Sequence, residues 1–73
     1  MDKYIYNKNC DANAQHEIHK STCSYAPTFF NKGKIGLKID NQYAFEAAQK
    51  MSPSKSFYMC RCCCHTWYLI HPK

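Results

Sequence analysis

Two short stretches near the start of the chain have the patterns of β-strands. Residues 3–7 are rich in aromatic and β-branched side chains, and residues 15–20 alternate with a period of two. Residues 8–14, between them, are rich in Asn, Asp and Ala, which is typical of a turn. We therefore expect an N-terminal β-hairpin, with His19 at the end of its second strand and His16 on the opposite face, at the surface.

The pattern then changes to a loop followed by a third strand. Residues 21–33 contain Ser, Thr, Pro, Asn and Gly, and predict a loop that includes Cys23. Residues 34–39 alternate again and predict a strand. Gly36 interrupts it and marks either a β-bulge or a close approach of another backbone.

Residues 42–51 have the clearest helical period in the chain. Asp40 or Asn41 is a suitable N-cap, because its short side chain can accept a hydrogen bond from the first helical turn. The Ser-Pro-Ser segment at 52–54 ends the helix. Small or apolar residues recur at i, i+3, i+4 and i+7 and predict a narrow face that packs on a sheet: Ala44, Ala47, Ala48 and Met51.

The C-terminal part combines cysteines with aromatic residues. Residues 57–65 predict a cysteine knuckle, and residues 66–70 are apolar enough for a final strand or turn. The sequence thus predicts one α+β domain spanning 1–73, with a hairpin, a third strand, one helix and the knuckle. We expect the following aromatic residues in the core and at its rim: Tyr4, Tyr6, Phe57, Tyr58, Trp67 and Tyr68.

Chain length changes the interpretation of the cysteines. A single core in 73 residues rarely leaves more than about 3–5 kcal/mol of stability, so such domains often need disulfides, a metal or a partner. The chain has six cysteines and four histidines. It shows neither the apolar run of a signal peptide nor that of a membrane span, so we expect a cytoplasmic location. Clustered cysteines there bind metal more often than they form disulfides.

Two pairs of residues have the spacing of metal ligands. His19 and Cys23 form an H-x3-C pair, and Cys60 and Cys63 form a C-x2-C pair. Structural zinc sites commonly draw four tetrahedral nitrogen and sulfur ligands from two such pairs. We therefore expect one Zn²⁺ ion to join the end of the hairpin to the knuckle.

Other residues near these pairs leave alternatives open. Cys62 and Cys64 flank the knuckle and could replace one of its two ligands, and His65 could replace the histidine ligand. Cys10 lies in a polar turn, where we expect an ordinary thiol. Glu17 is the one carboxylate near the histidine ligand, and either pairs with a lysine or orients the imidazole.

Three blocks of the sequence carry a resemblance to a known family. The residues concerned are Glu17, Ile18, His19, Cys23 and Pro27, then Gly36, Ala44 and Ala48, then Cys60, Cys63, Cys64, His65 and Thr66. In this N-K-N…E-V-H-x3-C…C-x2-C…C-H-T pattern, over nearly the whole chain, the protein resembles a family of small bacterial and phage zinc-binding proteins. The resemblance implies a zinc site and no particular activity. More loosely, the chain is similar to the zinc-binding domain of the Ada DNA-repair protein, which implies proximity to DNA.

The chain departs from the family pattern at three places. Ala14 stands where the family often has a turn glycine, and Met59 stands before Cys60 where glycine is usual. The segment from Cys60 to the C-H-T ending is shorter than in the pattern. This leaves open whether Cys62 or Cys63 is the second knuckle ligand.

Charge and site chemistry favour a binding role. A site with four protein ligands has no open position for a catalytic water, so we expect a non-enzymatic zinc module, phage-like in type, with a protein partner. The net charge of +5 is spread over scattered lysines, which does not make the dense basic stripe typical of nucleic-acid-binding proteins.

Two alternative functions remain. One is thiolate redox or alkyl-transfer chemistry. The other is nucleic-acid binding, through Lys32, Lys34, Lys38 and Arg61, with Tyr58 and Trp67 for stacking.

Overall fold

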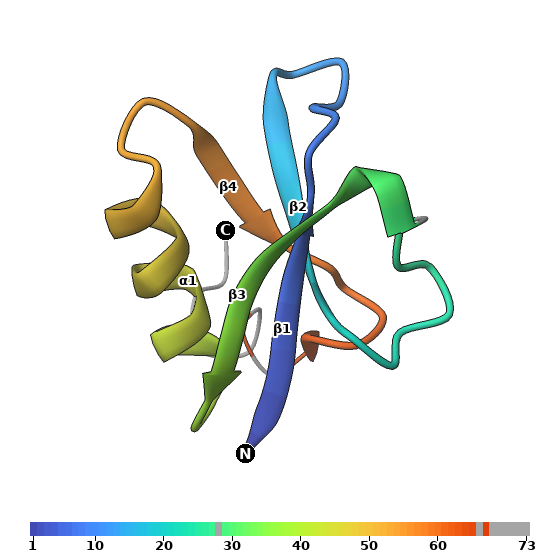
Figure 1. Cartoon of the computed structure of the whole chain (residues 1–73), viewed down its shortest axis with the longest axis vertical. Helices are drawn as coiled ribbons and strands as arrows, with labels where there is room; N and C mark the ends of the chain where they lie inside the picture. The colour runs from blue at the N-terminus through green and yellow to red at the C-terminus, as the bar shows by residue number, and fades with distance from the viewer. Residues whose placement is uncertain (28, 66, 68–73) are drawn as a thin grey trace.

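The computed structural model describes residues 1–27, 29–65 and 67, and within them contains four strands and one α-helix (Figure 1). In chain order the elements are β1 (Asp2–Asn7), β2 (Gln15–Lys20), the 3₁₀-helix η1 (Phe29–Asn31), β3 (Lys32–Lys38), α1 (Asn41–Met51) and β4 (Ser56–Met59). The strands form one mixed sheet in the order β3-β1-β2-β4. The predicted α+β class is therefore confirmed.

The N-terminal hairpin forms as its alternating pattern predicts. β1 and β2 pair antiparallel, and the Asp11 side chain stabilises the turn between them. Asp11 Oδ1 accepts hydrogen bonds from the backbone N–H groups of Asn13 (2.8 Å) and Gln15 (3.0 Å). Ala14 adopts a left-handed conformation with φ of 59°, which costs a residue with a Cβ atom more than it costs glycine.

β3 pairs antiparallel with β1 and contains the predicted bulge. The register shifts opposite Tyr4 and Ile5, so that Ile35 is the extra residue, and Gly36 has a φ of +105°. β3 is an edge strand, and its exposed side carries lysines, which discourage pairing with another chain. The strand starts two residues earlier than expected, at Lys32.

Gly33 gives β3 a position where no side chain fits. The Tyr6 ring lies directly over it, and a Cβ atom added at Gly33 would overlap that ring. Tyr6 has little room to move away, because its ring makes edge-to-face contacts with Phe57 (5.3 Å between centroids) and His16 (6.1 Å).

We expect Gly33→Ala to lower the free energy of unfolding by about 1–3 kcal/mol, the usual cost of overpacking. Urea denaturation measures this. Lys34→Ala, at the exposed neighbouring position of β3, is the matched control and should change stability by less than about 0.5 kcal/mol. Equal stability of the Gly33→Ala variant and the parent would contradict the packing argument.

The hydrophobic core lies between α1 and one face of the sheet. Asp40 is the N-cap, and its carboxylate accepts a hydrogen bond from the Tyr43 N–H at 3.1 Å. Ala44 and Ala48 are fully buried and Ala47 is partly buried, as predicted, but Met51, the last residue of the helix, is 52% exposed. The buried cluster consists of Tyr4, Tyr6, Ile18, Ile35, Ala44, Ala48, Phe57, Met59 and Cys64. Within the described ranges no helix combines the length and hydropathy needed to span a membrane.

The fourth strand was not expected. Residues 57–65 were predicted to form the knuckle as a whole, but Ser56–Met59 form β4, which runs parallel to β2 at the second edge of the sheet. A hydrogen bond from Cys60 N–H to the Ile18 carbonyl (2.8 Å) continues this ladder, so the knuckle begins only at Cys60. The strand or turn predicted at 66–70 lies outside the described residues except for Trp67, whose ring stacks on Phe45 at 4.5 Å.

Candidate metal centre

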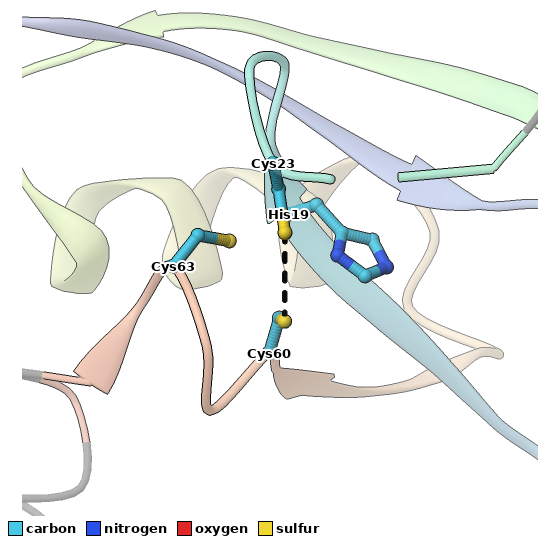
Figure 2. Close-up of side chains that lie close together, drawn as sticks. All are labelled: His19, Cys23, Cys60 and Cys63. Carbon is cyan, nitrogen blue, oxygen red and sulfur yellow. Dashed lines mark hydrogen bonds between the residues drawn. The ribbon is translucent and has the colours of Figure 1, made fainter. Parts of the chain in front are cut away.

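The parallel pairing of β2 and β4 brings the two predicted ligand pairs together. Ile18 lies opposite Met59 in this pairing, so the next residues along the chain, His19 within β2 and Cys60 directly after β4, lie at the same end of the sheet. Cys23 follows in the loop after β2, and Cys63 follows in the turn after β4 (Figure 2).

The four side chains converge on one point. One ligand atom from each of His19, Cys23, Cys60 and Cys63 can be chosen so that all four lie within 4.8 Å of one another. The sulfur atoms of Cys23 and Cys60 are 3.9 Å apart, although the two residues are 37 positions apart in the chain. Figure 2 shows the three sulfur atoms and one ring nitrogen of His19 turned toward a common centre. The group has the size and composition to hold one metal ion.

Backbone N–H groups are directed at the sulfur atoms. The Lys20 N–H donates to Cys63 Sγ at 3.2 Å. The backbone N–H groups of Cys62 and Cys63 lie near the Cys60 thiol and lower its pKa. Such bonds favour a charged thiolate over a neutral thiol, so the local backbone is arranged for metal-bound sulfur.

His19 supplies the test of whether a metal fits. Its side chain is 1% exposed, and Nε2 lies 3.1 Å from Glu17 Oε1. The other ring nitrogen, Nδ1, is buried and has no hydrogen-bond partner among the described residues. A buried polar atom without a partner is costly, and a metal ion at the centre of this group would provide one.

Burial sets the protonation of the metal-free site. Desolvation lowers the pKa of His19, against the opposing effect of Glu17, so the imidazole is neutral, which is the form that binds metals. Desolvation also raises the pKa of Cys60, although the N–H groups directed at it partly counter this, and it raises the pKa of Cys63 strongly. A divalent cation would reverse the shift of both thiols, because it stabilises the thiolates.

The fold separates Cys63 from the alternative knuckle ligands. A hydrogen bond from Cys64 N–H to the Cys60 carbonyl (2.9 Å) closes a helical turn. In this turn the Cys63 side chain belongs to the four-residue group, whereas Cys64 is fully buried in the core. The sulfur atoms of the two cysteines are nevertheless only 3.6 Å apart. Cys62 and His65 are exposed and do not belong to the four-residue group.

The remaining candidate residues lie away from the centre. Cys10 is exposed, as expected of an ordinary thiol. His16 was expected at the surface and is instead 8% exposed, because its Nδ1 contacts the Asn7 carbonyl (2.9 Å) and its ring packs against Phe57. The alternation of residues 15–20 cannot predict these contacts, because they depend on residues outside the strand.

A cavity that the sequence did not indicate opens beside the candidate metal centre. Its volume is about 670 Å³, and Glu17 and Cys60 belong both to its lining and to the surroundings of the centre. Aromatic rings also line it, including that of Tyr25, which is 68% exposed. The candidate metal centre therefore lies next to an open cavity.

The described fold and site define a small α+β domain with a candidate His-Cys₃ metal centre. Searches of protein-family models, curated proteins and solved structures found no match to this chain.

Proposed function

We propose that the protein is a structural zinc module that acts by binding another macromolecule. The observation that carries the proposal is the convergence of three cysteine sulfurs with the unpartnered, buried Nδ1 of His19. Donor sets of this kind, drawn from two close pairs, are typical of zinc sites that hold a fold together.

The chemistry of the donor set supports zinc and a structural role. Thiolate and imidazole ligands suit zinc better than they suit magnesium or calcium, which prefer oxygen. Four protein donors fill the tetrahedral coordination of zinc and leave no position for a catalytic water, which favours a non-enzymatic protein. Membership of the bacterial and phage zinc-binding family that the sequence resembles is part of the proposal.

We favour a protein as the partner, in the cytoplasm. The cavity beside the metal centre combines aromatic rings with the carboxylates of Asp11 and Glu17, which would repel a phosphate backbone. Arg61 lines the same cavity after β4, whereas the lysines considered for nucleic-acid binding lie on β3, the strand at the other edge of the sheet. The basic residues are thus divided between two regions, which weakens the nucleic-acid alternative.

Native mass spectrometry with the metal retained tests the zinc proposal. We expect one zinc per chain in the parent, loss of the ion in Cys60→Ser, and retention in Cys62→Ser. The second variant is the matched control because it removes an exposed thiol of the same knuckle. A metal-free parent, or equal loss from both variants, would contradict the assignment.

A salt titration of DNA and RNA affinity tests the choice of partner. A protein-binding module should show no appreciable nucleic-acid affinity near 50 mM salt. Tight binding that weakens steeply as salt rises would favour the nucleic-acid alternative instead.

A further inference from the structure

The partly exposed Glu17 and the buried His19 lie on the same face of β2, and their side chains are in contact. Residues two apart on a strand point to the same side of the sheet, so their side chains can meet. Here Glu17 Oε1 lies 3.1 Å from His19 Nε2, and the side chains are 32% and 1% exposed respectively. The carboxylate therefore joins the buried imidazole to the solvent-facing cavity.

The sequence left open whether Glu17 pairs with a lysine or orients the imidazole. Lys20, the nearest lysine in sequence, instead pairs with Asp2 at 3.6 Å. The Glu17 carboxylate lies against the His19 ring, with Oε1 3.1 Å from Nε2. The structure thus supports the second role.

We infer that Glu17 is a positioning residue that fixes the tautomer and the orientation of His19, so that Nδ1 is the metal-binding atom. This inference rests on the proposed zinc site. A carboxylate only accepts hydrogen bonds, so the ring nitrogen that faces it carries the proton. The lone pair of a neutral imidazole is then on Nδ1, the nitrogen that has no other partner.

The contact between Glu17 and His19 should favour metal binding energetically. A ligand histidine whose second nitrogen is held by a carboxylate loses less freedom on metal binding, and its metal-binding nitrogen is more basic. Without Glu17, the ring can rotate or change tautomer, and the site must select the correct form each time it binds the ion.

Two variants of Glu17 separate the hydrogen bond from the charge. We expect Glu17→Ala to weaken zinc binding by about 10- to 100-fold in a chelator competition assay. Glu17→Gln should recover most of this loss, since its amide oxygen can still accept from Nε2–H. Glu46→Ala removes the same charge from the exposed side of α1 and should leave affinity unchanged.

Nitrogen NMR of the His19 ring supplies a second measurement that does not depend on affinity. In the zinc-loaded parent, Nε2 should carry the proton, and in a ¹¹³Cd-substituted sample the metal should couple to Nδ1. In Glu17→Ala we expect exchange between ring states or coupling to Nε2. If this variant fails to fold at saturating zinc, the parent spectrum and the Gln variant still decide the question.

The outcomes distinguish the inference from the zinc proposal on which it rests. A parent that binds no zinc overturns both, and this is known before any variant is compared. A parent that binds zinc through Nε2, or a Glu17→Ala variant with unchanged affinity and unchanged Nδ1 coupling, overturns only the role of Glu17. A Gln variant as weak as the Ala variant also contradicts it, because the hydrogen bond alone would then have no effect.

Discussion

Removing the proposed zinc ion is expected to unfold this protein. Ordering 73 residues costs on the order of 100 kcal/mol, and a core of this size leaves only about 3–5 kcal/mol in favour of folding. Zinc binding contributes about 10–16 kcal/mol of apparent free energy in zinc-finger peptides. In its absence, His19 and Cys60 would stay buried around a centre that offers no partner to Nδ1 of His19.

Circular dichroism with and without a strong zinc chelator measures the effect. The zinc-loaded chain should unfold cooperatively on heating, and the chelated chain should show no such transition. Restoring zinc should restore the transition. Cys10→Ser, which removes an exposed thiol far from the centre, is the control and should respond to the chelator as the parent does. An unchanged melting temperature in the chelator would show that the metal does not stabilise the fold.

Truncating Ile18 should strongly destabilise the sheet. Ile18 is 0% exposed on the inner strand β2, where it belongs to the core cluster under α1. Ile18→Ala removes its buried methyl and methylene groups and leaves a cavity, so we expect a loss of about 2–5 kcal/mol in the free energy of unfolding. The backbone bond from Cys60 to the Ile18 carbonyl remains available in the variant.

Ile39→Ala is the matched control for this measurement. It deletes the same atoms from a residue that is 65% exposed, so stability should change by less than about 0.5 kcal/mol. Urea denaturation at saturating zinc keeps the contribution of the metal constant in both variants. Similar losses at the two positions would mean that the core does not lie where the structure places it.

The elements predicted correctly are those with local signals. The hairpin follows from alternation and an Asx-type turn at Asp11, and the helix follows from its period and the Asp40 cap. β4 was missed because its partner, β2, lies about 40 positions away, and a parallel pair has no connecting turn to indicate it. The burial of His16 depends on Asn7 and Phe57, and neither contact is visible in a strand pattern.

In the candidate site, too, some features could be predicted from the sequence and others depend on the fold. The H-x3-C and C-x2-C spacings predicted that His19, Cys23, Cys60 and Cys63 come together, and the structure places these four within reach of one ion. The choice of Cys63 over its neighbours depends on the turn closed by Cys64 N–H, which rotates Cys64 into the core. Metal binding by these residues stays a prediction until the ion is measured.

The parallel pairing of β2 and β4 has a kinetic consequence. The ladder from Gln15 to Ser56 joins the two paired strands that are farthest apart in the sequence, and such contacts form slowly because a long loop must close first. The proposed ion would bridge the ends of these two strands, so its capture and the docking of β4 would become one event. The refolding rate would then rise with the concentration of free zinc, while the local β1–β2 hairpin would form at a rate independent of it.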